Sequence, residues 1–149
     1  MQELSQDTIE RVLLRNGVGV LALVDNHHPY AIPMSFGYDG SSMLFPMQWG
    51  TGYDGRKERC VEANANACFT IYERDTDDDS IWRSVVITGQ LAEIEADDKE
   101  QAYASLAANA EFAPELGVWG IPFDDVNLRL LKLDPDTVSG REFSPYSSG

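Results

Sequence analysis

Large apolar residues recur at every second position between residues 29 and 36, namely Tyr30, Ile32, Met34 and Phe36. A period of two is typical of a strand with one buried face. Asp39 and Gly40 follow as turn residues, and the apolar run Met43–Phe45 predicts a strand that returns beside the first. The pattern therefore predicts an antiparallel hairpin in the first third of the chain.

Apolar spacing and end signals predict the other elements. A capping-box pattern at Asp7–Glu10 and the pair Asn16–Gly17 bound a first helix. Gly89 interrupts the longest β-type stretch and predicts a bulge there, and Asp134–Pro135 predicts the end of the last strand. We expect further strands at 18–24, 67–72, 81–95 and 126–133, helices at 56–66 and 97–109, a connection at 112–123, and a loosely ordered tail at 139–149.

Most of these strands follow one another through short turns, which favours antiparallel pairing. Neither an internal repeat nor a linker divides the chain, so we expect a single domain over residues 1–149. The predicted fold is mainly β (α+β), with about six antiparallel strands in a small closed or partly open barrel and with peripheral helices.

The chain is strongly acidic, with 25 Asp and Glu against 11 Lys and Arg and a formal net charge of -14. Such a surface repels nucleic acid and anionic membranes, so neither is an expected partner. Acidic surfaces poor in lysine stay soluble at high salt, which favours a salt-adapted, halophilic protein; an acidic protein without salt adaptation is the alternative. The sequence shows neither a signal peptide nor an apolar run of membrane-spanning length, so we expect a cytoplasmic protein.

The sequence contains no catalytic triad, metal motif or pair of catalytic carboxylates that we can recognise, and we expect no metal. Cys60 and Cys68 lack the spacing of metal ligands and are interpreted as small buried side chains. The acidic run Asp77–Asp79 is interpreted as a solvated loop. Arg56 and Lys57 stand at the start of a predicted helix, where free backbone N–H groups and two cations favour binding of a phosphate. Ordinary solvated helix residues are the alternative for this pair.

Four segments together resemble the pyridoxamine 5′-phosphate oxidase-like proteins, in the branch that contains nitroimidazole-resistance proteins. They are P-Y-A-I-P-M-S-F-G-Y-D-G at 29–40, M-L-F at 43–45, G-R-K at 55–57 and W-R-S-V-V-I-T-G at 82–89. The resemblance spans nearly the whole chain and implies an antiparallel split β-barrel. It also implies a homodimer that binds FMN in a cleft between its two subunits.

The same resemblance implies the residues that touch the cofactor. The flavin ring would lie along the strand 31–36 and reach the following strand, while the basic pair would hold the phosphate and the long strand would add a further contact. The implied set is Pro33, Met34, Ser35, Pro46, Met47, Arg56, Lys57, Arg83 and Ser84. For Ser84, an outward strand position without a ligand is the alternative.

We therefore expect an FMN-dependent oxidoreductase that uses a small-molecule electron donor and a small acceptor. Flavin chemistry resides in the cofactor, so it requires no protein acid or base. True pyridoxamine phosphate oxidation is not expected, because Phe36 stands where those oxidases carry a lysine, and Arg141 is the one basic residue where they carry a basic, histidine-containing segment. The alternative is a non-enzymatic flavin- or haem-binding module, which is favoured by Pro46, by its missing N–H donor, and by a longer loop at 48–55. A deazaflavin in place of FMN stays open.

Overall fold

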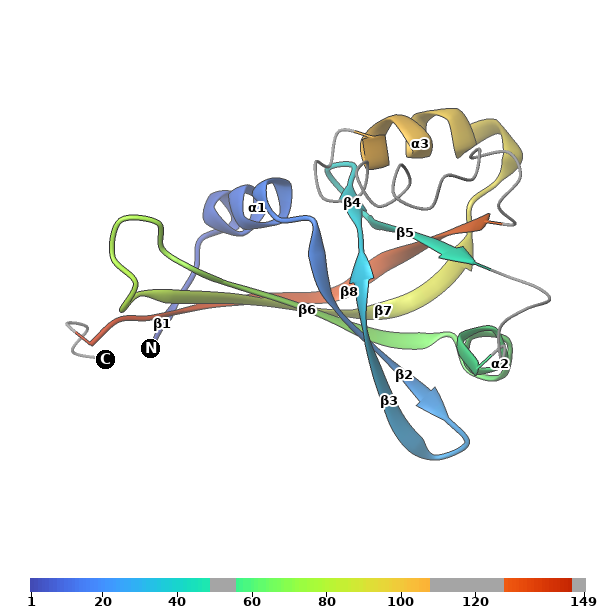
Figure 1. Cartoon of the computed structure of the whole chain (residues 1–149), viewed down its shortest axis with the longest axis horizontal. Coiled ribbons are helices and arrows are strands. Elements are labelled where there is room, and N and C mark those ends of the chain that lie inside the picture. The colour runs from blue at the N-terminus through green and yellow to red at the C-terminus, as the bar shows by residue number, and fades with distance from the viewer. Residues whose placement is uncertain (49–55, 108–127, 146–149) are drawn as a thin grey trace.

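The computed structural model describes residues 1–48, 56–107 and 128–145 of the chain (Figure 1). Eight strands form one antiparallel sheet in the order β3-β2-β6-β7-β8-β5-β4, with β1 paired to β8. The strands are β1 (Gln2–Glu3), β2 (Val18–Asp25), β3 (His28–Ser35), β4 (Gly37–Tyr38), β5 (Met43–Gln48), β6 (Asn66–Arg74), β7 (Trp82–Glu93) and β8 (Leu128–Phe143). The helices are α1 (Gln6–Arg15), α2 (Arg56–Ala63) and α3 (Lys99–Ala107), the last preceded by a 3-10 turn, η1 (Ala96–Asp98). The prediction of a mainly β, antiparallel split barrel is confirmed.

The sheet curls into a half-barrel because two consecutive strands, β3 and β4, lie at its opposite edges. β3 pairs with β2 at one edge, and β4 pairs with β5 at the other. Phe36 joins the two strands, and its N–H donates to the Gly17 carbonyl at 3.0 Å. The edges therefore meet at Phe36, whereas the β2–β3 hairpin and the far end of β5 diverge and leave the barrel open there (Figure 1).

Three buried phenylalanines fill the end where the edges meet. Phe69 of β6 stands edge-on to Phe36 at 5.0 Å and to Phe45 of β5 at 4.8 Å between ring centroids. All three rings are fully buried. Edge-to-face packing stabilises such clusters beyond the area that they bury. α1 closes this core with Ile9, Val12 and Leu13, and α3 packs on a second cluster through Ala102 and Leu106.

Two hairpin turns join neighbouring strands, and the turn predicted at Asp39–Gly40 is confirmed. Asn26 and His27 have φ of 48° and 76°, and they connect the closing pair Asp25 and His28. Two successive positive φ values give the twist that a two-residue hairpin needs. In the second turn the Asp39 carboxylate accepts the N–H groups of Ser41 and Ser42, and Gly40 has φ of 101°. That φ favours glycine.

Prolines occupy both open edges of the sheet. In the two-residue hairpin the closing pair is hydrogen-bonded, and such pairs then alternate along the strands. Pro29 and Pro33, opposite Val24 and Val20, therefore fall on non-bonded pairs and face away from β2. Pro46 of β5 lies on the other edge; a proline within a strand is tolerated where its missing donor faces away from the ladder.

β8 corrects two predictions, the end of the last strand at Asp134–Pro135 and the loosely ordered tail at 139–149. The strand continues through Pro135 to Phe143, so residues 139–143 belong to the sheet. The register explains why: Thr88 pairs with Thr137 and Gly89 with Pro135, so β8 has one extra residue opposite this point. The bulge predicted at Gly89 is thus confirmed, and a bulge is a place where a sheet accepts proline.

The caps of α1 also differ from prediction. Ser5, not Asp7, is the N-cap, and its hydroxyl accepts the Thr8 N–H at 3.2 Å. Asn16 is extended, with φ of -109°, and its side-chain amide donates to the Val12 carbonyl at 2.8 Å. Side-chain capping here replaces the left-handed glycine cap. The predicted connection at 112–123 and most of the predicted loop at 48–55 lie outside the described residues.

Candidate functional site

Arg56, the first residue of α2, lies against the tip of the β2–β3 hairpin. Its Nε donates to the Asp25 carboxylate at 2.8 Å, and its guanidinium carbon lies 3.9 Å from the centre of the Tyr30 ring. The hydrogen bond to Asp25 raises the pKa of Arg56 above its ordinary value. Lys57 follows on the same first turn and is half-buried. The predicted basic pair is thus fixed where the half-barrel opens.

Apolar packing holds α2 on this hairpin. β2 pairs with β6 only from Val20 to Ala22, so the hairpin tip extends past β6. Leu23 of β2 and Cys60 of α2 are both 2% exposed and belong to one core cluster. Burial raises the pKa of the Cys60 thiol, which favours an inert packing role. The prediction of a buried cysteine is confirmed for Cys60, whereas Cys68 is half-buried, and both are free thiols.

The predicted flavin-ring contacts lie on the two strands beside the opening. Pro33 is exposed and Ser35 half-buried on β3, while Pro46 is half-buried on β5. Met34 and Met47 point into the core and are 8% and 0% exposed. These two methionines can therefore meet a ligand through their backbone but not through their side chains. For Met34 this agrees with the alternation along β3, which predicted that its side chain faces the core.

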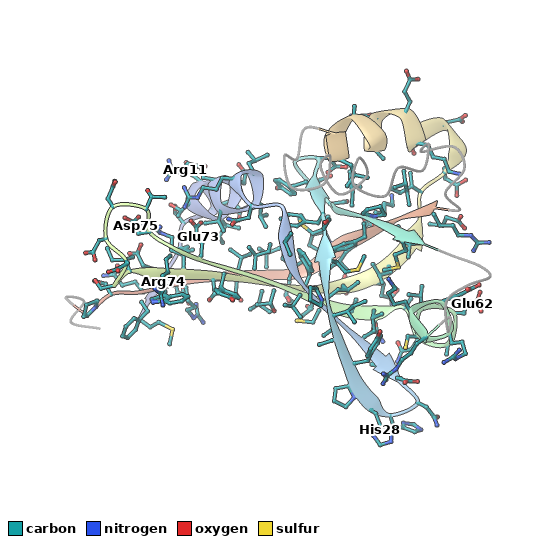
Figure 2. The ribbon with its side chains drawn as sticks, viewed as in Figure 1. Arg11, His28, Glu62, Glu73, Arg74 and Asp75 are labelled. Atoms are coloured by element: carbon teal, nitrogen blue, oxygen red, sulfur yellow. The ribbon has the colours of Figure 1, made fainter. Side chains whose placement is uncertain are left out.

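Arg83 and Ser84 lie at the opposite end of the sheet from α2. Figure 2 shows this separation, with Glu62 of α2 at one end and Asp75 at the other. Ser84 pairs with Tyr72 and with Arg141. The described chain therefore brings the basic pair close to the hairpin but does not bring Ser84 or Arg83 to it.

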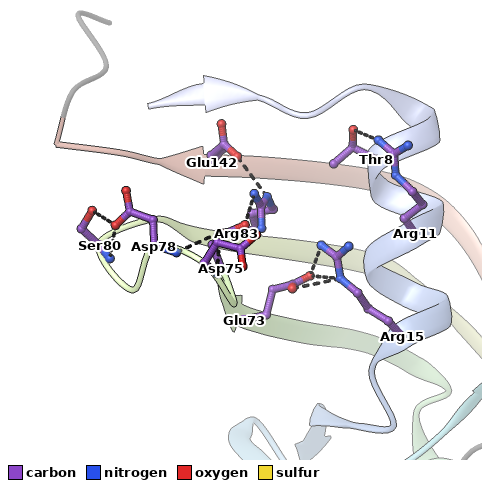
Figure 3. Close-up of polar contacts among 10 residues, drawn as sticks. Thr8, Arg11, Arg15, Glu73, Asp75, Asp78, Ser80, Arg83 and Glu142 are labelled. Atoms are coloured by element: carbon purple, nitrogen blue, oxygen red, sulfur yellow. Dashed lines mark hydrogen bonds and ion pairs between the residues drawn. The ribbon is translucent and has the colours of Figure 1, made fainter.

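Arg83 is engaged by two carboxylates. Its Nη2 donates to Asp75 at 2.8 Å and its Nε donates to Glu142 at 3.0 Å (Figure 3). The hydrogen bond from Arg83 holds the pKa of Asp75 below its usual range, helped by the N–H groups of Asp77 and Asp78. Sequence reasoning missed this network, because Glu142 fell in the segment expected to be a loose tail. Arg83 ties the β6–β7 loop to the end of β8.

The outward face of the sheet carries exposed apolar side chains. They are Val18 and Val20 of β2, Tyr72 of β6, and Phe143 of β8. Tyr72 stacks on Trp82 with ring centroids 5.9 Å apart. A cavity of about 170 Å³ beside this pair is lined by Ser84, Arg141 and Phe143, among others. Contiguous exposed apolar surface marks interaction sites in soluble proteins.

No three His, Cys, Asp or Glu side chains in residues 1–48, 56–107 and 128–145 gather as ligands of one metal ion. Within these ranges, none of the helices has the length and apolar character required to cross a bilayer.

Curled antiparallel strands, with the two edges of the sheet meeting at Phe36, define a split β-barrel protein. The chain belongs to the pyridoxamine 5′-phosphate oxidase family, whose family model matches residues 5–142. No curated protein matches the chain.

Solved structures share the fold over nearly the whole chain. A FAD-binding protein from Mesorhizobium loti is 23% identical with a TM-score of 0.76, over 96% of this chain and 98% of that one. A candidate 5-nitroimidazole antibiotic resistance protein from Bacteroides thetaiotaomicron is 19% identical with a TM-score of 0.71, over 95% and 87%. A FAD- and heme-binding protein from Mycobacterium smegmatis is 20% identical with a TM-score of 0.71, over 95% and 73%. At these identities the likeness shows the fold alone.

Proposed function

We propose that this chain binds FMN in the opening between β3 and β5, with the phosphate on Arg56 and Lys57. The observation that carries the proposal is Arg56, which lies at the start of α2 and is fixed against the hairpin by Asp25 and Tyr30. A phosphate dianion requires charge-assisted donors, and Arg and Lys supply a planar fork and a point charge. In an acidic chain, two adjacent cations at the mouth of the barrel fit this ligand.

The edge of β3 supplies complementary backbone groups for a flavin ring. Because Pro33 faces the open side, its neighbours Ala31 and Ser35, two residues away on either side, face that side too. The Ala31 N–H can donate to a flavin nitrogen or carbonyl oxygen, while Pro33 offers a carbonyl alone. Such hydrogen bonds tune the redox state of a flavin. The residues present therefore fit the cofactor.

We further propose a homodimer in which the outward sheet face packs against its copy. The exposed apolar residues on that face, Tyr72 and Phe143 foremost, support this assembly. Arg83 binds Asp75, which lies at the other end of the sheet from α2 (Figure 2), so a second copy is needed for all of the predicted contacts to meet one ligand. Arg83 would then act on the ligand site indirectly, by holding the β6–β7 loop in place.

Bound FMN would supply hydride and electron transfer between a small donor and a small acceptor, which makes the protein an oxidoreductase. The chain's own part is to bind and orient the cofactor. Pyridoxamine phosphate oxidation is not proposed, because Phe36 is fully buried and offers no cation to a substrate phosphate.

The second candidate is a non-enzymatic flavin- or haem-binding module. It is favoured by Pro46, which leaves the β5 edge without one N–H donor, and by structural relatives named for FAD or for FAD and heme. The two candidates differ in whether the bound flavin turns over. The oxidoreductase is supported if a nicotinamide or dithionite reduces the flavin and the reduced flavin then reduces an acceptor catalytically.

The experiment that tests the phosphate site compares FMN with riboflavin, which lacks the phosphate. We expect Arg56→Ala with Lys57→Ala to weaken FMN binding about 100-fold or more, since each charge-assisted hydrogen bond contributes about 1.5–3 kcal/mol. Riboflavin binding should stay unchanged. The matched control, Arg11→Ala with Arg59→Ala, removes two exposed cations and should leave FMN binding within about threefold. Equal FMN affinity in the wild-type protein and the Arg56/Lys57 variant would refute the site.

A further inference from the structure

Two side chains of the β2–β3 hairpin fix the Arg56 guanidinium from different directions. Asp25 accepts from Nε at 2.8 Å, in the plane of the guanidinium. The guanidinium carbon lies over the Tyr30 ring, 3.9 Å from the ring centroid. Asp25 and Tyr30 come from opposite strands of the hairpin, so the hairpin as a unit determines where the guanidinium lies.

An ion pair in this position contributes little to the stability of the fold. The side chains of Arg56 and Asp25 are 40% and 34% exposed, so solvent screens their attraction. The hairpin is already held on α2 by the buried Leu23 and Cys60. A carboxylate here also reduces the positive charge of a site that is to attract an anion. The Asp25 charge therefore weakens the attraction of an anion and adds little to the stability of the fold.

We propose that Asp25 is a positioning residue, which fixes the Arg56 guanidinium so that its Nη edge is oriented for a phosphate group. The proposal rests on the proposed phosphate site at Arg56. A guanidinium contributes most to the affinity for phosphate when its orientation is fixed before binding, because binding then costs no side-chain entropy. Asp25 sets the direction through Nε, and the Tyr30 ring holds the guanidinium carbon against the hairpin.

Two variants with the same net charge separate positioning from charge. Asp25→Asn removes the carboxylate charge but keeps an oxygen that accepts from Nε, whereas Asp25→Ala removes both. We expect FMN to bind Asp25→Ala at least tenfold more weakly than Asp25→Asn, while riboflavin binds both variants equally. Flavin fluorescence titration measures both dissociation constants. Glu62→Gln is the control for charge alone, because Glu62 is an exposed carboxylate on the same helix (Figure 2); it should leave the FMN dissociation constant within about twofold.

Equal FMN dissociation constants in Asp25→Asn and Asp25→Ala would overturn the proposal, and so would a parallel loss of riboflavin binding in Asp25→Ala, which would show a structural role. Inorganic phosphate supplies a readout without flavin: it should raise the melting temperature of Asp25→Asn more than that of Asp25→Ala. If the wild-type protein binds no flavin but this phosphate difference holds, the proposed function fails and the positioning role stands. If flavin binds but the two variants behave alike with both ligands, the positioning role fails and the proposed function stands.

Discussion

Replacing Phe69 with alanine tests whether the three buried phenylalanines hold the half-barrel closed. Phe69 is fully buried and stands edge-on to both Phe36 and Phe45, at 5.0 and 4.8 Å. Phe→Ala changes in a core cost about 3–5 kcal/mol, from lost burial and from the cavity that remains. Because two edge-to-face pairs are lost together, we expect a value near the upper end, about 4–5 kcal/mol.

The assay is equilibrium urea unfolding followed by circular dichroism at one protein concentration, with the slope m compared between variants. A loss of about 4–5 kcal/mol should lower the melting temperature by roughly 8–20 °C in a domain of this size. Phe69→Leu should cost less than about 2 kcal/mol, because it keeps most of the side-chain volume. The matched control is Phe143→Ala, since Phe143 is 54% exposed and its truncation should cost less than about 1 kcal/mol. A Phe69→Ala loss below about 2 kcal/mol, or one equal to that of Phe143→Ala, would refute the reasoning.

Two further predictions concern the loop network and the bulge. Asp75 has a lowered folded-state pKa, so its stabilising pairing with Arg83 is present above about pH 4 and is lost as pH falls through the folded pKa. Asp75→Asn should therefore be less stable than the wild-type protein at pH 7, and the difference should shrink as pH falls below about 4 in urea unfolding; a gap independent of pH would contradict this. At Gly89 an added Cβ would overlap the Asp134 backbone carbonyl, so Gly89→Ala should cost about 2–3 kcal/mol. Gly140→Ala, whose added Cβ meets side-chain atoms of Ile9 and Leu4 rather than backbone, should cost less in the same assay, and equal losses would contradict the role given to the carbonyl.

Local chemistry explains why the hairpin at residues 29–45 could be predicted from sequence. Asp39–Gly40 specifies its turn through a side-chain acceptor and tolerance of positive φ, and the structure confirms this turn. Alternation from Tyr30 to Phe36 likewise predicted which side of β3 faces the core. These properties depend on neighbours within a few residues.

Non-local pairing explains what sequence reasoning missed. Pro135 normally ends a strand, and only its position opposite Gly89, 46 residues earlier in the chain, lets β8 continue. The ion pair of Arg83 with Glu142 depends on that continuation. Of the predicted cofactor set, the structure brings Arg56 to the hairpin tip; the contacts with FMN stay predictions, as does salt adaptation.

The prolines at the sheet edges bear on how copies of this protein can associate. An uncapped strand edge is a template for aggregation, because another chain can extend the sheet through its backbone. Pro29, Pro33 and Pro46 interrupt the row of donors on both open edges, so fibrous growth by strand addition is disfavoured even at high concentration. Variants that replace these prolines with threonine would restore the donors and should aggregate more readily when the chain is partly unfolded.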